Sequence, residues 1–91
     1  MTEKFLAPKA DITYGQLDKV LKSFGFTRHE FERRGKAVQY DHKETGASIT
    51  LPLFPKKDYV MVHHLIAVRT TLDGFGVADR TVFEKKLKKV G

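Results

Sequence analysis

The sequence contains no cysteine, and it has no apolar run long enough to cross a membrane. The first absence excludes disulfide bonds and thiolate metal ligands, as is typical of small domains that fold in a reducing compartment. The longest apolar stretch, residues 59–68, is interrupted by His63 and His64. The apolar run at residues 5–7 is far too short for a signal peptide. We therefore expect a cytoplasmic protein that does not enter a membrane.

Several signatures of common enzyme classes are also missing. No Gly-x-Ser-x-Gly context surrounds either serine, and no glycine-rich stretch carries the other residues of a Walker or Rossmann loop. His63 and His64 are adjacent in a predicted helix, about 100° apart around its axis, so they cannot bind one metal ion as an i, i+4 pair could. We therefore expect no metal site and no small-molecule cofactor.

The totals indicate one small basic domain. Ninety-one residues leave no room for a second core, and 41% hydrophobic with 31% charged residues is ordinary for a globular protein. The net charge of +6 and the pI of about 9.7 favour attraction to nucleic acid, anionic lipid or an acidic protein. A basic domain that its charge merely keeps in solution is an equally good interpretation of these numbers.

Capping signals and apolar periodicity predict three helices after an N-terminal tail at residues 1–12. Thr13, with Gln16 three residues later, has the spacing of a capping box, and the helix that follows ends before Gly25. Asp58 is expected to cap a second helix that runs to about residue 73. Asp79 is expected to cap a third helix at residues 80–90.

Alternation of apolar and polar residues predicts three strands between the first two helices. Residues 27–34 form a charged strand that suits a sheet edge, and residues 37–42 and 48–53 form two further strands joined by a hairpin loop at residues 43–46. The order α-β-β-β-α-α indicates one α+β domain at residues 13–91, with the helices packed on one face of a three-stranded antiparallel sheet. The opposite sheet face, expected to stay open, carries Gln39, Asp41, Ser48 and Thr50.

Taken in order, the motifs resemble those of the HicA-like family, the RNA-cleaving toxins of bacterial toxin–antitoxin pairs. The resemblance covers roughly residues 13–90 and has five parts. They are the helix end Phe24-Gly25-Phe26, the turn glycine Gly35, the hairpin Tyr40-Asp41-His42-Lys43-Glu44-Thr45-Gly46, the strand Ile49-Thr50-Leu51-Pro52, and Gly74-Phe75-Gly76-Val77 followed by Phe83. The resemblance implies a fold like that of double-stranded-RNA-binding domains and an RNA substrate.

The catalytic histidine of that family lies two residues after the turn glycine, where this sequence has Ala37. A metal-free ribonuclease needs an acid or base within reach of the reacting oxygen, and alanine supplies neither. The resemblance therefore implies RNA binding without cleavage. The basic residues near the turn where the family contacts RNA, together with a polar neighbour on the open face, are the expected RNA-binding residues: Arg28, Arg33, Arg34, Lys36 and Gln39.

Alternatives remain open for these residues. His42 could replace the missing histidine in an active ribonuclease, or it could be a strand-end histidine that makes a structural hydrogen bond. The arginines could bind phosphates bidentately, or they could only protect an edge strand from aggregation. The domain could also be a protein-interaction module, whose partner the resemblance would make an HicB-like antitoxin.

Overall fold

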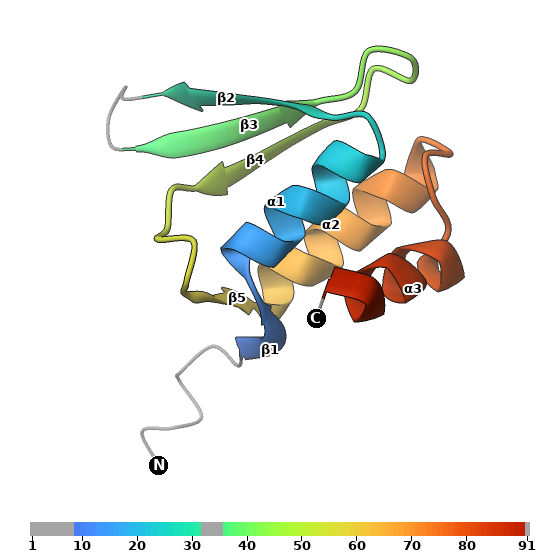
Figure 1. The fold of residues 1–91 in the computed structure, drawn as a ribbon. Coiled ribbons are helices and arrows are strands. Elements are labelled where there is room, and N and C mark those ends of the chain that lie inside the picture. The colour runs from blue at the N-terminus through green and yellow to red at the C-terminus, as the bar shows by residue number, and fades with distance from the viewer. Residues whose placement is uncertain (1–8, 32–35, 91) are drawn as a thin grey trace.

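The computed structural model describes residues 9–31 and 36–90 (Figure 1). The elements follow the order β1 (Lys9–Thr13), α1 (Tyr14–Ser23), β2 (Thr27–Phe31), β3 (Ala37–Asp41), β4 (Ser48–Pro52), β5 (Tyr59–Met61), α2 (Val62–Gly74) and α3 (Arg80–Val90). Strands β2, β3 and β4 form an antiparallel sheet in that order, and β1 pairs antiparallel with β5 in a separate ribbon.

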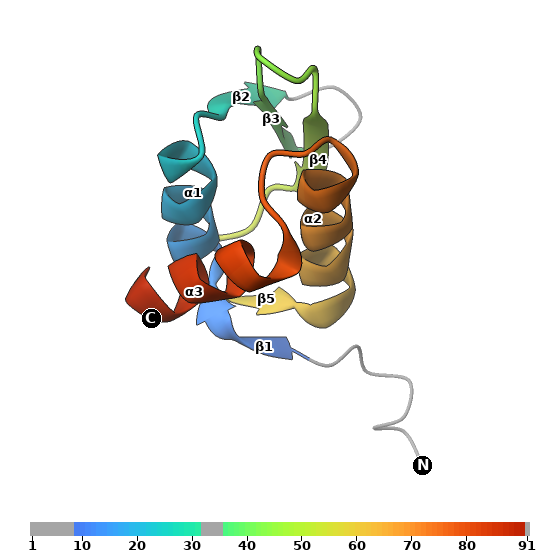
Figure 2. The same ribbon diagram turned by 90° about the vertical axis from the view of Figure 1, so that its right-hand side faces the viewer.

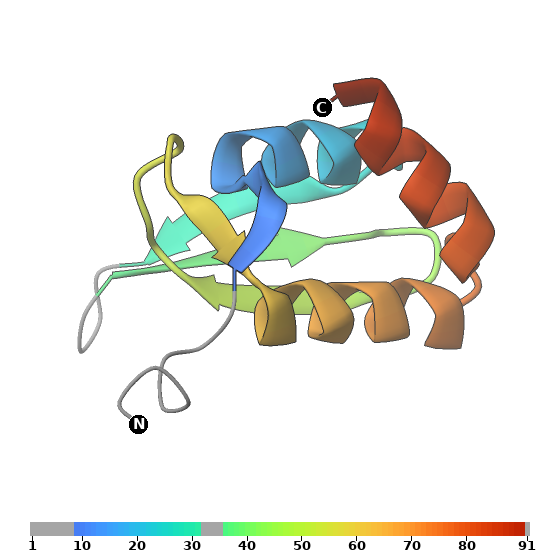
Figure 3. The same cartoon turned by 90° about the horizontal axis from the view of Figure 1, so that it is seen from below.

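Helices α1 and α2 lie side by side under one face of the three-stranded sheet (Figure 2). Helix α3 and the β1–β5 ribbon lie on the side of these two helices that faces away from the sheet (Figures 1 and 3). The predicted α+β architecture, with helices on one face of a three-stranded antiparallel sheet, is therefore confirmed.

The core fills the space between the sheet and the helices. Residues of α1, the inner sheet face, β5, α2 and α3 contribute to it, because each element presents an apolar stripe to the others. The most deeply buried side chains are those of Leu17, Val20, Leu21, Val60, Val68, Leu72 and Phe83. Val38, Tyr40, Ile49 and Leu51 cover them from the sheet.

Both ends of α1 follow the sequence signals. The Thr13 side chain accepts a hydrogen bond from the backbone of Gln16, whose own side chain accepts from Thr13, which completes the capping box. At the other end Gly25 has φ +98°, and the Phe26 N–H reaches back to the Leu21 carbonyl at 3.1 Å. This is the Schellman stop that the Phe-Gly-Phe sequence predicts.

Two predictions about chain segments are wrong. Residues 9–12 are not tail, because Lys9–Thr13 is strand β1, paired with β5. Asp58 does not cap α2, which begins only at Val62 after the three-residue strand β5. Asp58 instead uses its backbone carbonyl to accept the Tyr14 N–H at 2.9 Å. Pairing between segments about fifty residues apart in sequence has no local signature, so the pattern of residues 58–61 resembled a helix start.

The remaining boundaries agree closely with expectation. The Asp79 carboxylate caps α3 by accepting the Val82 N–H at 2.9 Å. Strands β3 and β4 each end one residue earlier than predicted. Strand β2 is an edge strand as expected and ends at Phe31, while the rest of the predicted strand, residues 32–34, and the turn glycine lie outside the described residues. Among the helices of the described ranges, none is long and apolar enough to span a bilayer.

Candidate nucleic-acid interface

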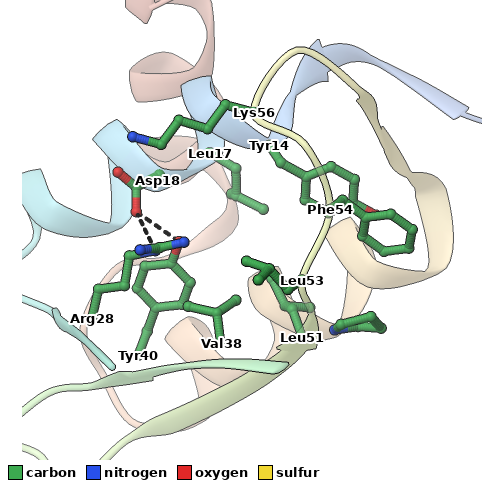
Figure 4. Close-up of a pocket in the computed structure, with 11 residues that line it drawn as sticks. Tyr14, Leu17, Asp18, Arg28, Val38, Tyr40, Leu51, Leu53, Phe54 and Lys56 are labelled. Carbon is green, nitrogen blue, oxygen red and sulfur yellow. Dashed lines mark hydrogen bonds and ion pairs between the residues drawn. The ribbon is translucent and has the colours of Figure 1, made fainter. Parts of the chain in front are cut away.

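A buried carboxylate links α1 to the three-stranded sheet on the β2 side of the molecule. Asp18 on α1 is only 6% exposed, and its Oδ1 accepts the Tyr40 hydroxyl of β3 at 2.7 Å (Figure 4). Lys22 Nζ lies 3.2 Å from Oδ2, and Arg28 Nε of β2 lies 3.5 Å from Oδ1. Three partners on three elements therefore hold one negative charge in place.

Tyr40 keeps its proton in this cluster. Burial, together with the adjacent Asp18 carboxylate, raises the pKa of Tyr40, so its hydroxyl stays a hydrogen-bond donor at all ordinary pH values. The Arg28 guanidinium also pairs with Glu30, the residue two positions along the same face of β2. The cavity beside the cluster is only about 20 Å³, enough for a single water molecule and too small for a substrate.

Cations gather around this carboxylate. The linker carbonyl of Lys56 accepts the Gly15 N–H of α1 at 2.9 Å, and the Lys56 side chain runs toward Asp18 (Figure 4). Lys19 is exposed one turn before the half-exposed Lys22. We call Lys19, Lys22, Arg28 and Lys56 the α1–β2 basic surface. Within the described part of the chain, neither Lys19 nor Lys56 has a carboxylate within 4 Å.

The structure does not bring the predicted RNA-binding residues together at one site. Arg28 belongs to the basic surface, although its side chain is only 22% exposed and points to the inner side of the sheet. Lys36 is exposed just before β3, where its carbonyl accepts the Leu53 N–H. Gln39 lies on the open sheet face, as predicted, and donates to Asp41 at 2.7 Å. Arg33 and Arg34 lie outside the described residues.

His42 is held by hydrogen bonds on both ring nitrogens. Its Nε2 lies 3.0 Å from the Phe24 carbonyl, which can only accept, so Nε2 carries the proton. Its Nδ1 lies 2.8 Å from the Thr45 hydroxyl, and the ring packs on Phe26 with 4.9 Å between centroids. The residue is 9% exposed. This geometry favours the structural alternative, because a general base must reach the proton of a substrate.

The sequence did not predict that another histidine, His29, lies next to a carboxylate on the open sheet face. His29 lies on the open sheet face, with its side chain 56% exposed and its Nε2 3.6 Å from Asp41 Oδ2. Gln39, which pairs with His29 in the β2–β3 register, donates to the other oxygen of the same carboxylate. The Gln39 hydrogen bond, with smaller contributions from Ser48 and His29, lowers the pKa of Asp41. Strand alternation could place each residue on this face, but only the register brings them together.

The two histidines of α2 have separate roles. His64 Nδ1 lies 2.9 Å from the Tyr14 hydroxyl, which also accepts the Met61 N–H, and Phe54 stacks on Tyr14 at 4.7 Å. His63 is exposed. Among the residues of 9–31 and 36–90, no group of three or more histidine, aspartate or glutamate side chains could hold a metal ion.

On these observations the described part of the chain is a small α+β domain that carries the α1–β2 basic surface. In comparisons with known proteins, no protein-family model, no curated protein and no solved structure matches the chain.

Proposed function

We propose that this domain binds RNA along the side formed by α1 and the β2 edge. The observation that carries the proposal is the α1–β2 basic surface: two of its four cations, Lys22 and Arg28, pair with Asp18 and Glu30, and Asp18 is buried. The exposed ends of Lys19, Lys22 and Lys56 can reach phosphate oxygens, which lysine binds as a point charge.

The order of elements supports an RNA partner. Helix α1, the β2-β3-β4 meander and, after the short strand β5, helix α2 come in the order that the resemblance to HicA-like toxins implies. Recognition on this proposal depends on charge and on the shape of the RNA backbone, as in double-stranded-RNA binding. The protein partner on the same proposal is an HicB-like antitoxin, and it would cover this side of the molecule.

Ala37 bears on whether the domain cleaves what it binds. It lies on the open sheet face, between Phe31 and Pro52 of the neighbouring strands. The methyl group of Ala37 cannot transfer a proton. Both ring nitrogens of His42 already form hydrogen bonds, one with the Phe24 carbonyl and one with the Thr45 hydroxyl. The proposed function is therefore binding, with neither of these two positions acting as a base.

The experiment measures affinity for labelled single- and double-stranded RNA at about 50 mM and about 200 mM salt. The triple variant Lys19→Gln, Lys22→Gln, Lys56→Gln should bind at least ~10-fold more weakly at low salt. Its plot of log affinity against log salt should be shallower by about three, since each phosphate contact contributes roughly one to that slope.

The matched control removes the same charge from α3. The variant Lys85→Gln, Lys88→Gln, Lys89→Gln loses three exposed lysines of a helix on the far side of α1 from the sheet, and it should bind nearly as tightly as the wild-type protein (Figure 2). Equal losses in the two variants would show that only net charge matters and would overturn the proposed surface. A wild-type protein that binds neither RNA would overturn the proposed function.

A further inference from the structure

Strand β2 distributes its charged and apolar residues between the two sheet faces in the reverse of the usual way. Its residues on the core side of the sheet, Arg28 and Glu30, are both charged. Its one aromatic residue, Phe31, pairs with Ala37 on the open face and is 42% exposed. A strand that only packs on a core has its apolar side chains inward and its charges outward. A residue that departs from this rule is typical of a functional surface.

The open face places a second ring and unoccupied hydrogen-bonding groups beside Phe31. His29 precedes Phe31 by two residues, so both side chains leave the same face of β2, roughly 7 Å apart along the strand. The His29 side chain is 56% exposed. Across the sheet from His29 lie Gln39 and then Thr50. Within residues 9–31 and 36–90, neither the Gln39 carbonyl oxygen nor the Thr50 hydroxyl has a hydrogen-bond partner.

This face is open, because all three helices lie on the other side of the sheet (Figures 1 and 2). Cations lie at its border. Lys36 is exposed immediately before Ala37, and it has no carboxylate within 4 Å in the described part of the chain. The α1–β2 basic surface lies on the core side of the β2 edge. A polymer with an anionic backbone and planar side groups fits this arrangement, and unpaired nucleic acid has that chemistry.

We propose that Phe31 and His29 form a platform on which unpaired bases of RNA stack, an inference that rests on the proposed RNA binding. The RNA backbone follows the β2 edge, where its phosphates contact the cations, and its bases turn onto the open sheet face. Every base has a π face that can stack on an aromatic ring, so this contact does not depend on sequence. The Gln39 carbonyl oxygen and the Thr50 hydroxyl can then accept hydrogen bonds from base amino groups.

Stacking on this platform selects unpaired RNA over a duplex. In a duplex the faces of the bases are covered by the neighbouring base pairs, so only an unpaired base can lie on Phe31. The cations of the α1–β2 basic surface, by contrast, can contact the phosphates of either form. The wild-type protein should therefore bind a single strand more tightly than a duplex with the same number of phosphates, and Phe31 should account for the difference.

The experiment measures the affinity of the full chain for such a single strand and such a duplex at about 50 mM salt. Phe31→Ala should bind the single strand about 10-fold more weakly and the duplex with unchanged affinity, since only the single strand loses a stacked base. Phe31→Trp keeps a stacking ring and should restore binding, whereas Phe31→Leu keeps apolar area without a ring and should not. Phe75→Ala is the matched control, because it removes another exposed aromatic side chain, 49% exposed at the end of α2, and should bind both RNAs normally.

Two further measurements separate stacking from charge. Phe31→Ala should leave the slope of log affinity against log salt unchanged, because it removes no phosphate contact, in contrast to the lysine variant of the basic surface. An abasic strand of the same length should bind the wild-type protein at least as weakly as the intact strand binds Phe31→Ala, and Phe31→Ala should weaken abasic binding no further. His29→Gln removes the second ring and should cause a smaller loss that is also specific to the single strand.

The two proposals fail in different ways. An unchanged affinity of Phe31→Ala for the single strand, or equal losses for the single strand and the duplex, would overturn the stacking platform and leave the proposed function standing. A wild-type dimer that Phe31→Ala converts to a monomer in sedimentation, with RNA affinity unchanged, would show that a second copy covers this face and would also overturn the platform. A protein that binds no RNA would overturn both proposals.

Discussion

Polar groups that the fold buries each join elements distant in the sequence. Asp18 accepts from Tyr40 and so connects α1 with β3, while His42 connects the hairpin with the end of α1. A buried polar group left without a partner costs about 1–3 kcal/mol, so each of these contacts also specifies how the elements are placed. Asp18 and His42, the buried polar residues of the described ranges, therefore both satisfy their own hydrogen bonds and hold two elements together.

The pair Tyr14 and His64 makes stability depend on pH. The Tyr14 hydroxyl accepts the Met61 N–H and lies 2.9 Å from His64 Nδ1, to which it can donate only while that nitrogen is unprotonated. Burial, and then the neighbouring His63, lowers the pKa of His64 below the ordinary value of 6.5. The contribution of this contact to the free energy of unfolding is thus complete above about pH 6.5 and is lost as the pH falls through the lowered pKa.

Urea unfolding at a series of pH values, with NMR titration of the His64 ring, measures this effect. The ring should titrate at a lower pH than histidine in a short peptide, and His64→Gln should flatten the acid side of the stability profile. His63→Gln leaves the Tyr14 contact in place and removes only the smaller cause of the lowered His64 pKa, so it should keep most of the slope. A His64 ring that titrates at or above the peptide value would contradict the prediction.

At the scale of the element, α1 is defined by its two ends. The capping box at Thr13 fixes where the helix begins, and the Schellman stop at Gly25 turns the chain into β2. The stop also sets the position of Phe24, whose carbonyl receives the His42 hydrogen bond. Local signals at both ends explain why this helix, unlike α2, agrees with the sequence prediction in its start and its end.

Gly25→Ala should lower the free energy of unfolding by about 1–2 kcal/mol, because φ +98° is a conformation that a residue with a Cβ rarely adopts. An added Cβ would make only ordinary contacts with the His42 ring, at 3.5 Å and 3.7 Å, so the cost lies in the backbone. Gly74→Ala is the control, since Gly74 lies at the end of α2 with open space around it and no positive φ. Denaturant titrations of both variants test this, and equal stabilities would refute it.

At the scale of the whole molecule, the stability of the domain depends on the packing of all its layers against one another. The sheet, the α1–α2 pair and α3 share one core cluster, and a chain of 91 residues has little buried surface to spare. Phe83 of α3 is 1% exposed, although the helix that carries it is otherwise mostly charged. We therefore expect α3 to unfold together with the rest of the chain.

Phe83→Ala should cost about 3–5 kcal/mol, a large part of the total stability of a small domain. Thermal unfolding followed by far-UV circular dichroism and by tyrosine fluorescence should show one coincident transition at a lower temperature. The control Val82→Ala truncates an exposed side chain of the same helix, 43% exposed, and should change the midpoint little. Loss of helical signal before the tyrosine transition would instead show that α3 unfolds alone.

The candidate site was only partly predictable from sequence. Charge near the β2–β3 turn pointed to Arg28 and Lys36, but Lys22 and Lys56 were not expected to lie near the same carboxylate as Arg28. Alternation along β2 could not show that Arg28 turns inward to Asp18 while His29 faces Asp41. Such contacts depend on strand register and on helix placement, which no window of adjacent residues contains.

By itself the sequence determined the elements whose signals are local: the capped helix α1, the alternating strands β3 and β4 with their hairpin, and the Asp79 cap of α3. These features arise from hydrogen bonds and side-chain periods within a few residues. Only the tertiary structure decided that Lys9–Thr13 is a strand, that α2 starts at Val62, and that His42 is enclosed while His29 is open. The physical reason is that these outcomes depend on pairing and packing between distant segments, whose energy is realised only when the chain has closed on itself.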